Sequence, residues 1–340
     1  MSRRLTGIGA GLVWFTSLTT LVLTSMVVGS ANIAIVDVID SLLRAAGLSD
    51  PEAAAPLDRI IIELRLPRTI IAVMVGAGLG VVGCLLQTVT RNDLADPFLF
   101  GLSSGAAAGA VFVITVTGDQ LGVWTLPLAA FVGGMVAAFI VLGLVQRLGN
   151  QGPAKLILAG LAVSFLFAAV TNYLIFSGDQ RAAHSVLFWT LGGLGTARWE
   201  VVPIVFVGML SINVFGLVQH RSLDALLAGD LAADSLGIRP QRLRKQVFLI
   251  SAFGTAIFVS VTGVIGFVGL MVPHLARAVS GTLHRGVVIL SAMIGAVLLT
   301  GSDIVARVVL SPQELPIGIV TSSIGAIFVF GLLLKSNRSH

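Results

Sequence analysis

The stretch Glu63–Ala110, ELRLPRTIIAVMVGAGLGVVGCLLQTVTRNDLADPFLFGLSSGAAAGA, decides the fold of this 340-residue chain. Two runs without any charged residue start within it, Thr69–Thr90 and Pro97–Gly118, and each is 22 residues long. A helix of about 20 apolar residues is long enough to cross the hydrocarbon core of a bilayer. The short polar segment Arg91–Asp96 separates the two runs. We therefore predict a helical hairpin in a membrane, with Arg91–Asp96 at its turn.

The composition of the whole chain agrees with a membrane protein. It is 56% hydrophobic and 11% charged, whereas soluble domains carry roughly 25% charged residues. The bilayer core offers the backbone no water, so only helices or closed barrels cross it. The apolar runs show no alternation of polar and apolar residues, which favours helices. We expect an all-α transmembrane protein with a single domain across residues 1–340. The single Cys84 allows no intrachain disulfide.

Further uncharged runs follow the same pattern. Gly7–Val36 is interpreted as a retained first span rather than a cleaved signal peptide, because its apolar part is longer than a signal sequence needs. Asp37–Arg65 is predicted to be a polar loop, and Ala182–Ala197, which contains His184, a short helix at the membrane edge. The other predicted spans are Gln120–Gln146, Leu156–Gly178, Val201–His220, Gly286–Ser302 and Leu315–Leu334.

The run Gln246–Ala276 is too long for one upright crossing. As a single helix its 31 residues would span roughly 46 Å, and Gly263, Gly266, Gly269 and Pro273 interrupt it. Two crossings give ten spans, with both termini on one side. That side then holds 14 of the 21 Lys and Arg residues but 5 of the 16 acidic residues. The positive-inside rule assigns it to the cytoplasm, and topology, rather than nucleic-acid binding, accounts for the basic residues.

Small-residue spacings in the hairpin indicate close helix packing. Gly78–Gly83 matches the pattern G-x-G-x-x-G, but it lies within a predicted span and follows no strand, so we do not interpret it as a dinucleotide site. Gly76 and Gly80 form a G-x-x-x-G pair, which lets two helix backbones approach closely. The same spacing recurs in the next run, at Gly101, Gly105 and Gly109.

The sequence offers no local signature of catalysis or metal binding. The five histidines are dispersed, and none has a partner at metal-ligand spacing. No nucleophile with a base and an orienting partner is found, and the chain carries no G-x-x-x-x-G-K-[ST] loop for ATP phosphates. We therefore predict no catalytic residue and no metal or cofactor site.

The hydrophilic segment Arg221–Lys245 is predicted to form a short pair of amphipathic helices. Gly229 divides the pair and Gly237 ends it. The leucines with helical spacing are Leu223, Leu226, Leu227 and Leu231. The acidic residues Asp224, Asp230 and Asp234 disfavour contact with an anionic leaflet. This favours docking into a partner protein over the alternative of a helix lying on lipid.

Several motifs together resemble the iron-siderophore/haem/cobalamin permease family of ABC importers. The resemblance extends from Glu63 to Leu334. The motifs are Leu66-Pro67-Arg68-Thr69, Gln87 with Arg91-Asn92-Asp93-Leu94-Ala95-Asp96-Pro97 and Gly101, Ser103-Ser104-Gly105, Leu231-Ala232-Ala233-Asp234-Ser235-Leu236-Gly237, Gly266–Arg277, Asp303-Ile304-Val305-Ala306-Arg307 and Glu314-Leu315-Pro316-Ile317-Gly318.

This resemblance implies a ten-span subunit with an inverted repeat, in the bacterial cytoplasmic membrane. Its implied partners are a second permease copy or paralogue, two cytosolic ATPases that bind ATP and Mg²⁺, and an extracytoplasmic binding protein. By motif position, Arg65, Arg68 and Arg307 would dock the binding protein, and the charge distribution places them outside as otherwise unexplained cations. The ATPase would contact Leu223, Leu226, Leu227, Asp230, Leu231, Asp234, Ser235, Leu236 and Gly237. The pathway wall and its helix packing would involve Gly76, Gly80, Gln87, Gly101 and Gly105.

The family leaves the cargo open among ferric siderophore, haem and cobalamin, in that order of expectation. His184, near Phe188 and Trp189, could contact a haem-like ligand, although a solvated loop histidine is the simpler interpretation. Two other classes of function were considered. An ion-coupled transporter usually places ionisable residues within its spans, and these spans are nearly free of charge. A membrane enzyme would need a clustered polar site.

Overall fold

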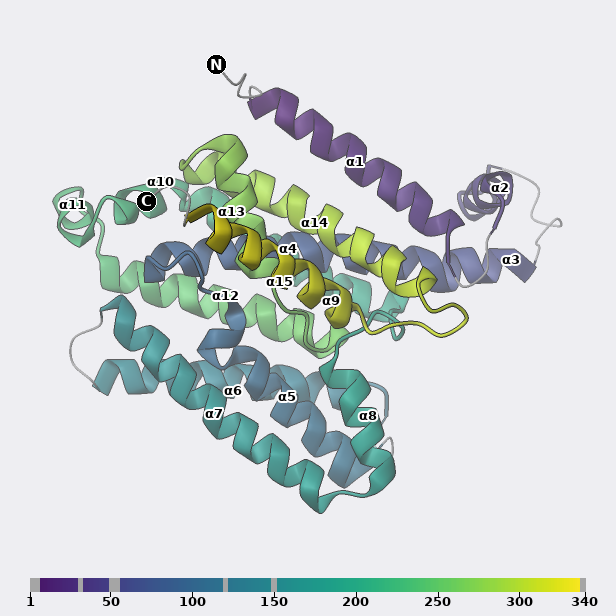
Figure 1. Cartoon of the computed structure of the whole chain (residues 1–340), viewed down its shortest axis with the longest axis horizontal. Coiled ribbons are helices and arrows are strands. Elements are labelled where there is room, and N and C mark those ends of the chain that lie inside the picture. The colour runs from purple at the N-terminus through teal and green to yellow at the C-terminus, as the bar shows by residue number, and fades with distance from the viewer. Residues whose placement is uncertain (1–6, 30–32, 49–55, 119–121, 148–151, 337–340) are drawn as a thin grey trace.

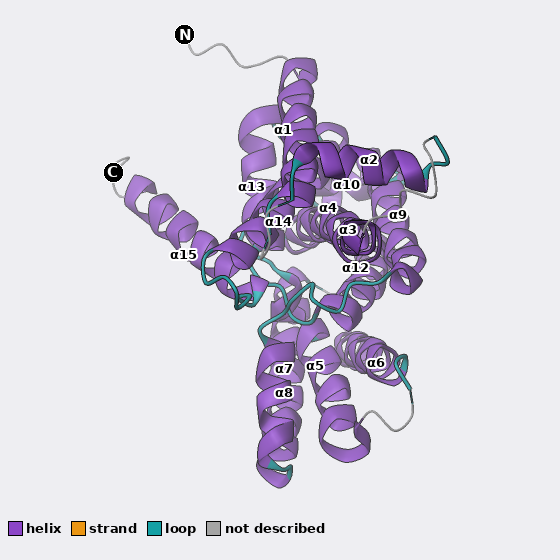
Figure 2. Ribbon diagram, turned by 90° about the vertical axis from the view of Figure 1, so that its right-hand side faces the viewer, coloured by secondary structure: helices purple, strands orange, loops and turns teal. Residues whose placement is uncertain are grey.

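Helix α4 (Leu66–Thr90) lies at the centre of the molecule (Figure 1). The computed structural model describes residues 7–29, 33–48, 56–118, 122–147 and 152–336, and the regular elements in these ranges are all helices (Figure 2). α4 continues α3 (Pro56–Arg59) and the π-helical segment η2 (Ile60–Arg65). In the most apolar part of this continuous element, 89% of the residues are buried by other helices. α4 is therefore the element around which the others pack.

The predicted hairpin is present. Arg91 ends α4 in a left-handed conformation, with φ of 48°. Asp96 starts the next segment by accepting a hydrogen bond from the Phe98 amide at 3.0 Å, as an N-cap residue does. The second arm is not one uniform helix. It consists of η3 (Pro97–Phe100), α5 (Leu102–Phe112) and the π-helical η4 (Val113–Thr117).

The other helices form two groups around α4 (Figure 1). The helices α5 to α8 lie together on one side, and α1 lies on the opposite side, against α14. The first group continues with α6 (Thr125–Arg147), α7 (Pro153–Ser177) and α8 (Gln180–Thr190). The remaining elements are α1 (Gly7–Val27), α2 (Ile35–Ala45), η6 (Trp199–Val201), α9 (Val202–Val218), α10 (His220–Leu227), α11 (Asp230–Ser235), α12 (Pro240–Thr262), α13 (Val268–Ser280), α14 (His284–Val308) and α15 (Ile317–Ser336).

Among the described residues, seven helical stretches are long and apolar enough to cross a membrane, and two shorter apolar helices, Gly11–Val27 and Leu102–Thr117, accompany them. The interpretation of Asp37–Arg65 as a polar loop was wrong where the structure describes it, because α2, α3 and η2 occupy it. α2 forms because its apolar side can be buried: Val38 packs with Met26, Ile33 and Ile61 in a small cluster of its own.

The run Gln246–Ala276 divides into two helices, but not at every residue that we expected. α12 ends before Gly263, whose φ is 65°, and α13 begins after Phe267. Pro273 and Gly269 lie inside α13. A proline in a helix leaves the carbonyl four residues earlier without its usual donor. Here that carbonyl belongs to Gly269, and the Gln87 side-chain amide donates to it at 3.2 Å. A neighbouring helix thus satisfies the freed group and α13 continues.

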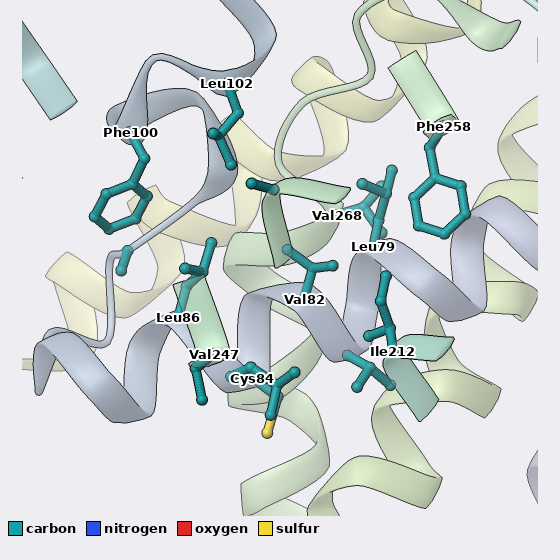
Figure 3. Packing of buried hydrophobic residues seen from close by; sticks show 14 of the residues in the cluster. Leu79, Val82, Cys84, Leu86, Phe100, Leu102, Ile212, Val247, Phe258 and Val268 are labelled. Atoms are coloured by element: carbon teal, nitrogen blue, oxygen red, sulfur yellow. The ribbon is translucent and has the colours of Figure 1, made fainter. Parts of the chain in front are cut away.

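Close backbone contacts hold the central helices together. A Cβ added at Gly76 would lie 2.3 Å from the Gly295 carbonyl oxygen, and one added at Gly80 would lie 2.4 Å from that of Ser291, so α4 touches α14 through both glycines. Gly105 of α5 approaches the Gly133 carbonyl of α6 in the same way. Around α4, side chains such as Leu79, Val82 and Leu86 interdigitate with those of neighbouring helices (Figure 3). In lipid such packing, rather than exclusion of water, drives helix association.

The first and last described helices, α1 and α15, each have one end toward the same side of the molecule (Figure 1). In Figure 1, α1 begins and α15 ends toward the side on which α10 and α11 lie. The helices α2 and α3 lie at the opposite end. The helix pair predicted from Arg221–Lys245 is thus present, on the same side as the start of α1 and the end of α15.

Candidate functional site

A cavity with a volume of about 640 Å³ lies beside α8. Its lining combines the aromatic side chains Phe188 and Trp189 with charged residues, Arg68, Asp179 and Glu314. The Asp179 carboxylate also caps α8 by accepting a hydrogen bond from the Ala182 amide at 2.6 Å. Such a lining of aromatic and polar groups suits a large organic ligand better than a small ion. We call this space the outer cavity, because the charge distribution of the sequence predicts that this side lies outside.

A second cavity, of about 330 Å³, lies toward the hinge of the hairpin. It is lined by the hinge residues Leu94 and Asp96, by Phe98, and by Phe267 and Leu270 at the start of α13. Asp96 is the acidic residue of this lining, and it is buried. We call this space the inner cavity.

Three chain segments meet between the two cavities. The segments are the end of α8, the break between α12 and α13, and the start of α15. Backbone hydrogen bonds join them: the Gly193 amide donates to the Thr262 carbonyl at 2.8 Å, the Ile317 amide to Gly192 at 3.0 Å, and the Gly318 amide to Leu191 at 3.1 Å. We call this contact the junction. It separates the outer lining residues Gly192, Gly263 and Ile317 from the inner lining residues Leu191, Val264 and Gly318.

The junction requires glycine. Gly263 has φ of 65°, and a Cβ there would lie 2.2 Å from the Trp189 carbonyl oxygen. Gly192 has φ of 71°, and a Cβ added there would lie 2.4 Å from the Val264 carbonyl oxygen. Any larger residue at either position would strain the backbone and push the segments apart. Gly263 of the α12–α13 break thus both ends α12 and allows the close backbone contact of the junction.

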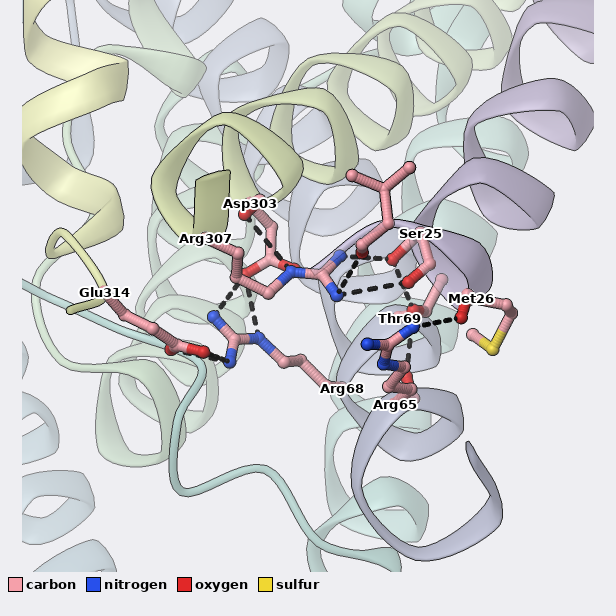
Figure 4. A network of polar contacts seen from close by, with 9 residues as sticks. Ser25, Met26, Arg65, Arg68, Thr69, Asp303, Arg307 and Glu314 are labelled. Carbon is pink, nitrogen blue, oxygen red and sulfur yellow. Dashed lines mark hydrogen bonds and ion pairs between the residues drawn. The ribbon is translucent and has the colours of Figure 1, made fainter. Parts of the chain in front are cut away.

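The three arginines expected at the outer face are not bare cations. Arg65 and Arg307 are buried and donate to the last turn of α1 (Figure 4). Arg65 donates to the carbonyls of Met26 at 2.5 Å and Val27 at 3.0 Å. Arg307 donates to the Ser25 carbonyl at 3.1 Å and to the Ser25 hydroxyl at 2.6 Å. The last carbonyls of a helix have no partner within it, so the two arginines cap α1.

Arg68 is held by two carboxylates. Its Nε donates to Asp303 at 2.9 Å, and its Nη1 donates to Glu314 at 2.8 Å (Figure 4). Asp303 is fully buried and also pairs with Arg307 at 3.1 Å. Arg68 also lines the outer cavity, which Arg65 and Arg307 do not. The expectation that all three are unexplained outward charges was therefore wrong, because each has partners within the chain, and Arg68 alone of the three faces the outer cavity.

The residues predicted to contact an ATPase divide into two sets. Leu223 and Leu226 are fully buried in the main core, whereas Leu231 is 88% exposed and Leu236 is 69% exposed. The predicted leucine stripe is not continuous, because the chain turns at Gly229, with φ of 121°, between α10 and α11. Gly237, with φ of 77°, follows α11 at the expected end. The exposed set is Leu227, Leu231, Asp234, Ser235, Leu236 and Gly237.

Asp230 at the start of α11 is paired with Arg91 and Arg244, and neither pair was predicted from the sequence. Arg244 donates to it at 2.7 and 2.9 Å, and Arg91 also donates to it. The hydrogen bonds from Arg244, together with the positive charges of Arg244 and Arg91, hold the pKa of Asp230 below its usual value. Asp230 therefore stays ionised and bound to the ends of α4 and α12.

Asp224 of α10 forms a second link to the body of the protein. It accepts hydrogen bonds from the His284 backbone amide at 2.8 Å and from His284 Nδ1 at 2.7 Å. Nε2 of the same ring lies 2.7 Å from the Thr88 hydroxyl on α4. No local sequence pattern predicts this arrangement, because its three members lie on different helices.

His184 does not line either cavity. It is exposed on α8, and its ring lies 4.8 Å from that of Phe188. Its neighbours Ser185, Phe188 and Trp189 line the outer cavity instead. Within the described ranges, no three His, Cys, Asp or Glu residues lie close enough together to hold a metal ion.

The structure has the architecture of a multi-pass transport subunit. Its long apolar helices pack around two cavities separated by the junction, and an amphipathic helix pair lies at one end. The chain belongs to the FecCD transport family, whose profile matches residues 17–335. Permeases of this family are non-catalytic transport subunits, and a partner ATPase hydrolyses ATP.

Curated relatives of the chain carry different cargo names. The hemin transport system permease protein HmuU of Yersinia pestis is 34% identical, over 94% of this chain and 95% of its own length. The cobalamin import system permease protein BtuC of Halobacterium salinarum is 39% identical, over 81% and 73%. The Fe(3+) dicitrate transport system permease protein FecD of Escherichia coli K12 is 36% identical, over 85% and 89%.

A solved structure of a metal-chelate type ABC transporter in an inward-facing conformation superimposes with a TM-score of 0.83 and 30% identity, over 96% of this chain and 98% of its own. The chain is therefore a membrane-spanning ABC importer permease of the iron-chelate, haem and cobalamin class.

Proposed function

We propose that this chain is the permease subunit of a bacterial importer that moves a ferric siderophore into the cytoplasm. The observation that carries the proposal is the pair of cavities on either side of the junction. Such an arrangement suits alternating access, in which the cargo enters the outer cavity, the junction rearranges, and the inner cavity opens. A cargo or partner shifts this equilibrium only through different affinities for the two states.

The proposed topology has ten crossings in the inner membrane, in one transmembrane domain over residues 1–340. The seven long apolar stretches and the two shorter ones supply nine crossings, and α13 supplies the tenth. α13 has 13 residues, or roughly 20 Å at 1.5 Å per residue, and the extended segment before it completes the crossing. α10 and α11 then lie in the cytoplasm together with both termini. The spans α4 to α7 and α12 to α15 would be the two halves of an inverted repeat of the type found in many transporters.

The proposed partners are a second permease copy or a paralogue, two cytosolic ATPases and an extracytoplasmic binding protein. The exposed Leu231 and Leu236 support docking of the ATPase, because an apolar side chain on a hydrophilic helix gains by burial in a partner. ATP and Mg²⁺ would bind the ATPase, and this chain would carry no cofactor of its own. Of the three outer arginines, Arg68 is the best placed to meet an acidic residue of the binding protein, because it borders the outer cavity.

Ferric siderophore is proposed ahead of haem and cobalamin. The lining of the outer cavity offers polar groups such as Ser185 and Thr196 beside Phe188 and Trp189, which suits a polar chelate with aromatic parts. A haem-like cargo remains the second candidate, since Phe188 and Trp189 could also stack on a porphyrin.

Reconstituted transport tests this function directly. The permease and its ATPase are placed in liposomes with the loaded binding protein, and uptake is measured with labelled iron-siderophore, haem and cobalamin. We expect uptake that requires ATP and favours the siderophore. Uptake that persists without the ATPase and collapses with the ion gradient would instead identify a secondary transporter. A preference for haem or cobalamin would keep the importer and replace the cargo.

Docking of the binding protein is tested at Arg68. Arg68→Glu should weaken binding of the loaded binding protein to the purified permease–ATPase complex, while the ATPase still co-purifies. Arg59→Glu is the matched control, because Arg59 also lies near the start of the long central element but is 82% exposed and pairs with Glu63 on its own helix. Equal affinities for wild type and Arg68→Glu would remove Arg68 from the docking surface.

A further inference from the structure

The cytoplasmic helix pair has one side attached to the protein and one side free. α10 is attached through Leu223 and Leu226, both fully buried in the main core. α11 has Ala233 as its buried residue, and its Leu231 points away from the protein. Apolar packing therefore fixes α10 far better than α11. The remaining contacts that attach α11 to the rest of the protein are polar.

The polar attachment of α11 is Asp230. Its carboxylate lies between Arg91, at the C-terminal end of α4, and Arg244, in the first turns of α12. The Arg244 side chain is only 6% exposed, and its Nε also donates to the Val89 carbonyl in the last turn of α4 at 3.2 Å. A guanidinium buried in this way needs a counter-charge. Asp230 is the carboxylate that supplies it.

Asp224 attaches α10 to the same turn of α4 by a separate route. It binds His284, and the His284 ring in turn contacts Thr88. Thr88, Val89 and Arg91 all belong to the end of α4. Two acidic residues of the helix pair thus reach one helical turn through different intermediaries.

The same turn of α4 also borders the inner cavity. Gln87 donates to the Leu270 carbonyl at 3.0 Å and accepts a hydrogen bond from Arg277 at 2.5 Å. Leu270 lines the inner cavity, as do Leu94 and Asp96 of the hinge that follows α4. A displacement of this turn therefore reaches the cavity lining through contacts of one or two residues.

We propose that Asp230 and Asp224 are positioning residues that make the last turn of α4 move with the cytoplasmic helix pair, so that ATPase-driven motion of the pair changes the inner cavity. The inference rests on the proposed function as an ATPase-driven permease. It assigns the leucines of the exposed side to holding the ATPase and the two carboxylates to transmitting its movement.

The test distinguishes residues that bind the ATPase from residues that transmit its movement to the inner cavity. Asp230→Asn and Asp224→Asn keep the side-chain size and remove the charge. Arg221→Gln is the control, because Arg221 also carries a charge on the helix pair, is exposed, and makes no ion pair among the described residues. Three quantities are measured on the reconstituted complex: the amount of co-purified ATPase, the rate of ATP hydrolysis, and the cargo transported per ATP hydrolysed.

We expect both variants to retain the ATPase and to hydrolyse ATP, while the cargo transported per ATP falls about fivefold, the lower end of measured couplings between sites. Arg221→Gln should match the wild type, and Asp230→Glu should keep most of the ratio because its carboxylate can still reach both arginines. If Asp230→Asn does not assemble, Asp224→Asn and Arg91→Gln decide by the same ratio.

An unchanged ratio in the assembled variants would overturn the inference, and so would a loss of ATPase binding that fully accounts for the loss of transport. Failure of the proposed function looks different. In that case the wild-type complex itself would show no ATP-dependent uptake.

Discussion

The hydrogen bond between Gln87 and Gly269 allows a quantitative test of how α13 tolerates its internal proline. Pro273 has no amide hydrogen, so the Gly269 carbonyl loses its donor within the helix. The Gln87 amide replaces that donor at 3.2 Å and also bonds Leu270 at 3.0 Å, while its oxygen accepts from Arg277. Gln87→Met keeps an unbranched side chain of similar length and removes all of these bonds.

The expected cost follows from the bonds that are lost. Two neutral hydrogen bonds contribute about 1 kcal/mol each, and the bond from the Arg277 guanidinium about 1.5 kcal/mol or more. Arg277 also pairs with the exposed Asp93 at 3.1 Å. Because Arg277 keeps this partner when Gln87 is replaced, we take about 1.5 kcal/mol for the loss of its hydrogen bond. We therefore expect Gln87→Met to lower the free energy of unfolding by about 3.5 kcal/mol.

The companion variant Pro273→Ala restores an amide that can donate to the Gly269 carbonyl. In that background, Gln87→Met no longer leaves the carbonyl unpaired, which otherwise costs about 1–3 kcal/mol. The cost of Gln87→Met should therefore be at least about 1 kcal/mol smaller in the Pro273→Ala protein than in the wild type.

The assay is a double-mutant cycle. Unfolding in detergent is followed for the wild type, Gln87→Met, Pro273→Ala and the double variant, and the interaction energy is obtained from the four free energies. Additivity to within roughly 0.5 kcal/mol, the usual result for independent residues, would refute the view that Gln87 acts by satisfying the carbonyl that Pro273 frees.

Three further predictions concern glycines and leucines. Gly76→Ala should lower the free energy of unfolding in detergent by about 1–3 kcal/mol, the usual cost of overpacking. Gly143→Ala should leave it unchanged, because a Cβ added at Gly143 meets no atom within 4 Å. Equal stabilities of the two variants would disprove the α4–α14 contact. Gly263→Ala should reduce transport while the ATPase still binds, because a side chain there opens the junction, and full uptake by this variant would argue against the junction as a barrier. Leu231→Asp should release the ATPase on purification without destabilising the permease, whereas Leu226→Asp should destabilise the permease itself. If the ATPase still co-purifies with Leu231→Asp, α11 would instead be interpreted as a helix that lies on lipid.

The sequence alone was enough to identify the membrane class, the hairpin and most of the crossing helices. These features depend on local patterns: long apolar runs, a polar turn before a proline, and glycines at helix ends. The division of Gln246–Ala276 into two helices was predicted for the same reason. The position of the break was predicted only in part, because Pro273 stays helical when a distant Gln87 replaces the missing donor.

The partners of the charged residues could not be predicted from the sequence. Arg68 meets Asp303 and Glu314, which are 235 and 246 residues away along the chain, and Asp230 meets an arginine that lies 139 residues before it. Hydropathy and spacing describe the neighbours of a residue along one helix, whereas an ion pair depends on which helices pack together. The outer arginines therefore looked unpaired in the sequence and are paired in the fold.

The hairpin Glu63–Ala110 shows both contributions. Its sequence determined that two apolar arms would cross a membrane around a polar turn. The tertiary structure alone decided that its first arm would be the central helix, with α1 capped by the arginine at its start and the helix pair α10–α11 bound at its end. The physical reason is that the polarity of neighbouring side chains along the chain sets which segments are buried. The partners of buried charged and backbone groups depend instead on which helices pack against each other.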